Sequence, residues 1–88
     1  MKIIVEVFGT LREKLGWTKK IVELEGRETT LRQVLEKLDI SEIVLEGDMI
    51  REGFIVLVNG VHAQFKGHGN AKLRDHDTVS IFPPGGGG

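Results

Sequence analysis

Apolar residues recur at alternate positions along four segments of the chain, which are Lys2–Phe8, Thr18–Leu24, Phe54–Val58 and Thr78–Phe82. β-Branched residues recur in these segments at a period of two, which is typical of strands that bury one face. Each segment is therefore predicted to be a β-strand. Gly9 is expected to end the first strand, and a polar loop containing Gly16 to join it to the second strand in an antiparallel hairpin.

A different period follows, because apolar residues now recur at helical spacing: Leu31, Val34, Leu35 and Leu38. Thr30 and Gln33 fit a capping box, in which the threonine hydroxyl accepts a hydrogen bond from a free backbone N–H at the start of the helix. The pattern predicts a helix of roughly two to three turns, a length that needs tertiary packing to persist. It is expected to end at Lys37–Asp39, and Ser41–Leu45 to add a further short turn of helix.

Turn-forming residues predict the remaining connections. Gly47 and Gly53 are expected to bracket a loop. Asn59-Gly60 predicts a type I′ turn, because both residues accept a positive φ, and Val61–Phe65 is then expected to return as a fourth, short strand. Lys66–Asn70 is predicted to be a loop before the last strand.

The resulting order is strand, strand, helix, strand, short strand, strand. One helix that buries its apolar stripe against one mixed sheet closes the core of so small a domain. The predicted fold class is therefore α+β, a β-grasp (ubiquitin-like) fold with a mixed sheet packed on one main helix. Residues 1–84 are expected to form the β-grasp domain and residues 85–88 a flexible glycine tail.

The tail combines stiff and permissive residues. Pro83 and Pro84 fix their own φ and push the preceding residue into an extended state, so they are expected to stop the last strand. The glycines of 85–88 carry no side chains, and the segment from Pro83 to Gly88 reaches roughly 20 Å when extended. Such a tail can carry a carboxylate into a narrow active site on another protein. The alternative is a flexible terminal spacer without chemistry.

A β-grasp domain that ends in an aromatic residue, two prolines and a glycine pair resembles the MoaD/ThiS-like sulfur carriers. The resemblance is to the small subunit of molybdopterin synthase (MoaD) and the small archaeal ubiquitin-like modifiers, and more distantly to the thiamine sulfur carrier (ThiS). It covers nearly the whole chain and is most specific in four segments: Val56–Gly60, Leu73–Val79, Ile81–Pro84 and Gly87-Gly88. The chain departs from the family at Gly85 and Gly86, where a β-branched and a small residue are common.

The resemblance implies a chemistry for Gly88. A partner similar to ubiquitin-activating enzymes, an adenylyltransferase, would adenylate the Gly88 carboxylate with ATP, and a sulfur donor protein would convert it into a thiocarboxylate. Gly87 would let the partner approach the backbone closely. The chain would be a carrier that acts with a partner enzyme, with the large subunit of molybdopterin synthase as a further partner. It would hold no cofactor of its own, since the partner consumes the ATP.

The alternation of the strands also predicts a docking surface. Seven residues are expected to point at the helix: Ile3, Val5, Val7, Val56, Val58, Val79 and Ile81. Four large apolar residues then point away and form a patch of the kind that marks an interface: Ile4, Phe8, Leu57 and Phe82. Ordinary partial burial explains Ile4 and Leu57 equally well, whereas aromatic residues often anchor interfaces. The predicted partner-binding residues are Phe8, Leu57, Phe82, Pro83 and Pro84.

Composition narrows the possible functions. The 88 residues include no cysteine, so a disulfide, a thiolate metal site and a thiol nucleophile are excluded, and carried sulfur has to come from a donor. The net charge is −1 with interspersed signs, which predicts no nucleic-acid partner. No signal peptide and no membrane-spanning run is expected, and the predicted location is cytoplasmic.

The remaining polar residues suggest no separate site. His62, His68 and His76 lack metal-ligand spacing, so no metal is predicted and they are expected to be solvated. Asp75 and Asp77 precede the last strand, which favours a turn role.

Three functions remain open. The first is a sulfur carrier, with molybdopterin (molybdenum or tungsten cofactor) synthesis as its destination. The second is a protein modifier that joins Gly88 to lysines of target proteins. The third is a non-catalytic interaction module. The first two share the activation step, and the Phe-Pro-Pro ending favours the pterin branch over thiamine.

Overall fold

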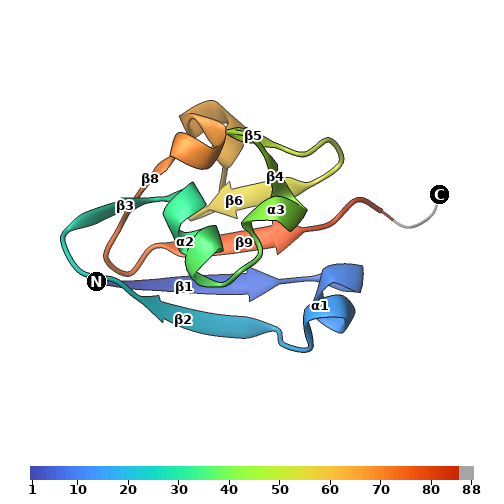
Figure 1. The fold of residues 1–88 in the computed structure, drawn as a ribbon, viewed down its shortest axis with the longest axis horizontal. Coiled ribbons are helices and arrows are strands. Elements are labelled where there is room, and N and C mark those ends of the chain that lie inside the picture. The colour runs from blue at the N-terminus through green and yellow to red at the C-terminus, as the bar shows by residue number, and fades with distance from the viewer. Residues whose placement is uncertain (86–88) are drawn as a thin grey trace.

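The four alternating segments form one mixed sheet in the computed structural model, which describes residues 1–85. The sheet has five strands in the order β2 (Lys19–Glu23), β1 (Lys2–Val7), β9 (Thr78–Phe82), β6 (Ile55–Val58) and β7 (Val61–His62). The two central strands, β1 and β9, run parallel, and the other neighbours are antiparallel. Figure 1 shows that β1 and β9 stop at the same end of the sheet, beside the start of the tail. The predicted β-grasp fold is confirmed.

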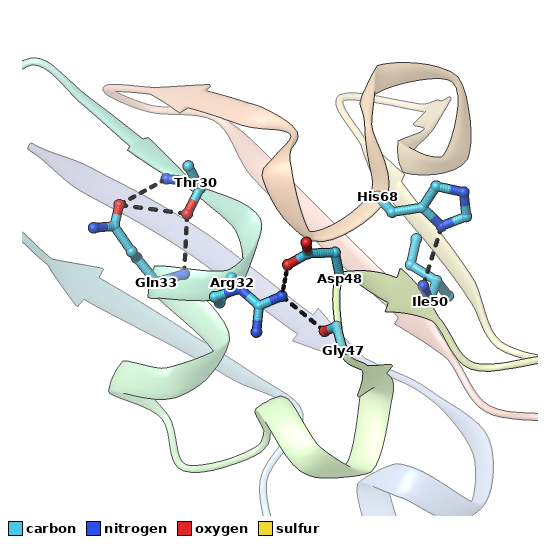
Figure 2. Close-up of polar contacts among 7 residues, drawn as sticks. All are labelled: Thr30, Arg32, Gln33, Gly47, Asp48, Ile50 and His68. Atoms are coloured by element: carbon cyan, nitrogen blue, oxygen red, sulfur yellow. Dashed lines mark hydrogen bonds and ion pairs between the residues drawn. The ribbon is translucent and has the colours of Figure 1, made fainter.

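The main helix, α2 (Leu31–Lys37), lies against one face of this sheet together with α3 (Ser41–Val44) (Figure 1). The predicted capping box starts α2. The backbone N–H of Gln33 donates to Thr30 Oγ1 at 3.2 Å, and the backbone N–H of Thr30 donates to Gln33 Oε1 at 3.2 Å (Figure 2). These two bonds satisfy N–H groups that have no partner within the helix.

The core lies between α2 and the inner face of the sheet, which is the face toward the helix. All seven residues predicted to point at the helix are there, each no more than 2% exposed. Leu31, Val34 and Leu35 of α2 are fully buried against them. The structure therefore confirms both that the strands alternate and which residues of each strand face the helix.

The polar loop expected after β1 is wrong, because residues 9–15 form a helix, α1 (Gly9–Leu15). Leu11 is buried and Leu15 packs against the core, so one side of this short helix is apolar at a spacing of four residues. Gly16 ends it in the left-handed region at φ 79°, where its N–H donates to Arg12 O.

Two small antiparallel ribbons were not predicted. One pairs β3 (Glu28–Thr30) with β8 (Lys72–Arg74), and the other pairs β4 (Leu45–Glu46), just before the expected loop, with β5 (Met49–Ile50) inside it. Strands of two or three residues are too short to show a period. Their pairing depends on segments that are brought together by the rest of the fold.

The Asn59-Gly60 turn is confirmed, with φ values of 49° and 83°. The strand that follows it is shorter than predicted: β7 ends at His62, and Ala63–Lys66 form the 3₁₀ helix η1. Ala63 is fully buried, which turns the chain off the sheet after two residues of pairing.

The expected loop at residues 66–70 contains a second 3₁₀ helix, η2 (His68–Asn70), and a solvated His68 is wrong. His68 Nδ1 accepts a hydrogen bond from the backbone N–H of Ile50 at 3.1 Å (Figure 2). Arg32 of α2 pairs with Asp48 and donates to Gly47 O at 2.7 Å. These contacts fasten the β4–β5 ribbon between α2 and η2.

The turn role predicted for Asp75 and Asp77 is confirmed. Asp75 Oδ1 accepts from the backbone N–H of Lys2 at 2.7 Å, and Asp77 Oδ2 accepts from the backbone N–H of Arg74 at 2.8 Å. Asn59 Nδ2 donates to Asp77 Oδ1 at 2.9 Å. The bonds hold the start of β9 against β1 and the end of β6.

Candidate functional site

The candidate site is the place where the tail leaves the sheet. The chain stays bonded to β9 for one residue after β1 ends at Val7, because the backbone N–H of Phe8 donates to Ile81 O at 3.1 Å. Pro83 and Pro84 follow Phe82 directly and offer no N–H, so the ladder ends there. The described chain ends one residue later, at Gly85. Gly87 and Gly88, the predicted reactive residues, lie outside the described residues.

Two aromatic rings lie beside the root of the tail, by which we mean Pro83 and Pro84. Phe8 and Phe82 come from neighbouring parallel strands and stack with their centroids 4.4 Å apart and their planes at 8°. Both side chains are half-buried on the outer face of the sheet, the face away from α2. Stacking of this kind holds the two strand ends together where backbone pairing stops.

The apolar surface continues from this pair onto β6. Ile55 lies directly opposite Phe82 and is 44% exposed, and Leu57 is two residues further on the same face. We call these residues, with the two prolines, the outer patch: Phe8, Ile55, Leu57, Phe82, Pro83 and Pro84. All five residues predicted to bind a partner therefore lie on one surface. Ile55 was missed, although its place between two inward-pointing neighbours would have put it on this face.

Ile4 does not belong to the outer patch, so the prediction of a single patch with four members is wrong. Glu6 and Ser80 pair across β1 and β9 between Ile4 and the two phenylalanines. Ile4 lies instead opposite Ile21 of β2, which is 59% exposed. Four residues of strand separate Ile4 from Phe8 by about 13 Å, beyond side-chain contact.

A small hollow opens between the outer patch and the beginning of α1, with a volume of ≈ 240 Å³. Its lining is mainly apolar and consists of Phe8, Gly9, Thr10, Phe82, Pro83, Pro84 and Gly85. None of these side chains is ionisable. The hollow can therefore accept an apolar group of a partner, but the described residues provide no acid, base or charged group for catalysis there.

Among the described residues, the ionisable group with a clearly shifted pKa is Asp75, which lies away from the candidate site. The backbone N–H of Lys2 donates to the Asp75 carboxylate and lowers the pKa of Asp75, with a smaller contribution from nearby His76. Asp75 precedes β9, whereas the tail follows it. This perturbed group is therefore part of the fold and is not part of the candidate site.

The described residues contain no cluster of three metal-ligating side chains. No helix among them is long and apolar enough to cross a membrane. The candidate site itself is distinguished by its apolar surface and by the tail that begins there.

Comparison with known proteins identifies the family. The model of the ThiS family matches residues 5–88, nearly the whole chain and through its last residue. The chain belongs to the ThiS family. No curated protein matches it in a comparison of whole sequences.

Solved structures resemble this ThiS-family chain along its full length. SAMP1 from Haloferax volcanii is 26% identical with a TM-score of 0.78, and the match covers 100% of both chains. The Haloferax volcanii HVO 2177 protein is 29% identical with a TM-score of 0.78, covering 100% of this chain and 87% of the other. A chain of the BexX/CysO complex from Amycolatopsis orientalis is 25% identical with a TM-score of 0.76, covering 98% and 99%.

The family assigns the chain a class of function. ThiS-family proteins are small carriers that work with activating enzymes and are not catalysts themselves. The chain is therefore a ubiquitin-like carrier, either of sulfur or in the manner of a small modifier protein, and not an enzyme.

Proposed function

We propose that the chain is a cytoplasmic sulfur carrier whose Gly88 carboxylate is activated by a partner and converted into a thiocarboxylate. The supporting observation is the combination of a ThiS-family match that reaches residue 88 with a tail root that is stiff, apolar and free of ionisable groups. Residues 1–84 form the docking body, and the glycines of 85–88 deliver the carboxylate.

The chemistry takes place in the partner, an adenylyltransferase similar to ubiquitin-activating enzymes. A Gly88 carboxylate oxygen attacks the α-phosphorus of ATP, and pyrophosphate leaves. A sulfide-level sulfur from a donor protein then bonds to the acyl carbon, and AMP leaves with the electron pair of the C–O bond. The product carries one sulfur in place of one oxygen. Gly87 lets the partner close around the backbone, since it has no side chain.

The outer patch docks the body onto this partner. Its aromatic pair, Phe8 and Phe82, is half-buried and lies at the root of the tail, where binding energy can orient the reacting end. The occurrence of a chain with similar fold in the BexX/CysO complex supports docking through a stable body. We propose the large subunit of molybdopterin synthase as the acceptor of the sulfur, in synthesis of the molybdenum or tungsten cofactor.

Conjugation to proteins is the second candidate. It is favoured by the similarity to SAMP1, whose name stands for small archaeal modifier protein 1, because this similarity extends over 100% of both chains. The activation step is the same, but a lysine amine of the target then attacks the acyl carbon, AMP leaves with the electron pair of the C–O bond, and the amine loses a proton to give an isopeptide bond.

Intact mass spectrometry of the chain purified from its own cells tests the proposal. We expect a fraction of the protein in which one oxygen is replaced by sulfur, and no such fraction in a variant that lacks Gly87-Gly88. Isopeptide-linked Gly-Gly remnants on other proteins, without the sulfur-containing species, would favour the modifier. If neither product forms and the truncated variant complements a deletion of the gene, both candidates fail and an interaction module remains.

A further inference from the structure

The two prolines of the tail rest on two glycines that are far apart in the sequence. A Cβ atom at position 53 would stand 3.0 Å from both Cβ and Cγ of Pro84 and 3.7 Å from its Cα. A Cβ at position 9 would stand 3.4 Å from Cγ of Pro83, which is ordinary contact. The approach is therefore tight only at Gly53, where any other residue displaces Pro84 by a few tenths of an ångström.

Gly53 lies in the turn that leads into β6. The backbone N–H of Phe54 donates to Arg51 O at 3.1 Å and closes this turn, in which Gly53 has a φ of +90°. A positive φ at the third position of a turn already favours glycine. The contact with Pro84 is a separate requirement, because it concerns the space beside the turn and not its backbone conformation.

We propose that Gly53 is a positioning residue for the tail. Pro84 packs down onto the bare backbone of Gly53, and this contact sets the direction in which the chain continues from the sheet. Because the ring of each proline fixes its own φ, the step from Phe82 to Pro84 is stiff, and the contact at Gly53 fixes the point and the direction at which Gly85 begins. The glycine tail thereby starts from a preset point on the docked body, which reduces the ordering that delivery of the Gly88 carboxylate to the activating enzyme requires. The inference rests on the proposed activation of Gly88.

Matched glycines separate this role from backbone strain. Gly26 has a φ of +91° and nothing within 4 Å of a Cβ, so Gly26→Ala carries the same strain as Gly53→Ala without the contact. Gly47 (φ +59°, nothing within 4 Å) is matched in the same way to Gly9 (φ +58°). Within each pair the φ values agree within 1°, and a proline of the tail lies next to the new methyl group in only one member.

The experiment measures steady-state adenylation of each variant by the activating enzyme, with ¹³C chemical shifts of Pro84 recorded in the free carrier. We expect Gly53→Ala to lower kcat about tenfold relative to Gly26→Ala, with KM within about twofold, because the body docks normally while the carboxylate is misdirected. The Pro84 shifts should move in Gly53→Ala and stay in place in Gly26→Ala. Gly9→Ala should differ less from Gly47→Ala.

A second variant removes the colliding atoms. In a Pro84→Gly background, Gly53→Ala should lower kcat no further, since the Cβ and Cγ that it would meet are absent. Equal kcat for Gly53→Ala and Gly26→Ala, unmoved Pro84 shifts, or additive effects in the double variant would overturn the inference. A wild-type chain that the enzyme does not adenylate would refute the proposed function instead, and shifted Pro84 signals would then still show the packing contact.

Discussion

The two faces of the sheet are made by the same strands but serve different ends, and residues 81 and 82 show the contrast most directly. Ile81 points inward and is fully buried in the core, whereas Phe82, its neighbour, points outward and is half-buried against Phe8. The pleat of a strand produces this alternation without regard to function. The faces differ because helices cover the inner one, while the outer one keeps apolar area available to a partner.

The contrast teaches how so small a carrier divides its apolar residues. Complete burial of the inner residues removes the most apolar area from water and stabilises the fold. Partial burial on the outer patch contributes less to stability, but its remaining exposed area can be buried by a partner. Substitutions on the two faces should therefore separate the stability of the domain from its activation.

Ile81→Ala should have the largest effect. Removing a fully buried isoleucine leaves a cavity in the core and should lower the free energy of unfolding by about 2–5 kcal/mol. Chemical denaturation monitored by circular dichroism measures the change. A loss well below 1 kcal/mol would mean that the inner face is not the main source of stability.

Phe82→Ala should change activation more than folding. Loss of the half-buried ring should cost less stability than Ile81→Ala, while kcat/KM for adenylation falls at least about tenfold, or about 1.4 kcal/mol. Ile21→Ala is the matched control, because Ile21 is exposed on the same face but lies beyond the Glu6–Ser80 row. Normal activation of Phe82→Ala, or an equal loss in Ile21→Ala, would contradict the assignment of the outer patch.

Thr30→Ala tests the N-terminal cap of α2, the helix that covers the inner face of the sheet. Without the hydroxyl, the N–H of Gln33 loses its partner at the start of α2, and the free energy of unfolding should fall by about 1 kcal/mol. Thr30→Ser keeps the hydroxyl and should recover most of this loss. Adenylation of Thr30→Ala at a temperature where it is folded should equal that of the wild type, and a defect there would connect α2 to docking.

Asp75→Asn should have the smallest effect and should be confined to acid pH. The pKa of Asp75 is lowered in the folded state, so its ionised carboxylate adds stability above its usual pKa of 3.8, and this stability is lost as the pH falls through the lowered value. Asparagine keeps a carbonyl acceptor for the Lys2 N–H but does not titrate. Unfolding measured from pH 7 to pH 2 should therefore show a shallower acid loss in the variant. Identical acid profiles would contradict this.

Elements with a periodic pattern that continues over several residues, or with a local motif such as a helix cap, were predictable from the sequence. The strands Lys2–Val7 and Thr78–Phe82 and the cap at Thr30 follow from alternation and from one hydroxyl. The helix α1 was missed because only Leu11 and Leu15 mark its apolar side. The short ribbons were missed because two or three residues carry no period and depend on partners distant in the sequence.

Four features could be read from the amino-acid sequence alone: the alternation of the strands, the inward direction of Ile81, the turn at Asn59-Gly60 and the proline–glycine composition of the tail. These depend on local backbone preferences and on the period of apolar residues. The fold was needed to show that Ile55 lies directly opposite Phe82, that Glu6 and Ser80 keep Ile4 apart from the outer patch, and that Gly53 lies against Pro84. Those relations depend on strand register and on the packing of a turn against the tail, which join residues that no local pattern connects.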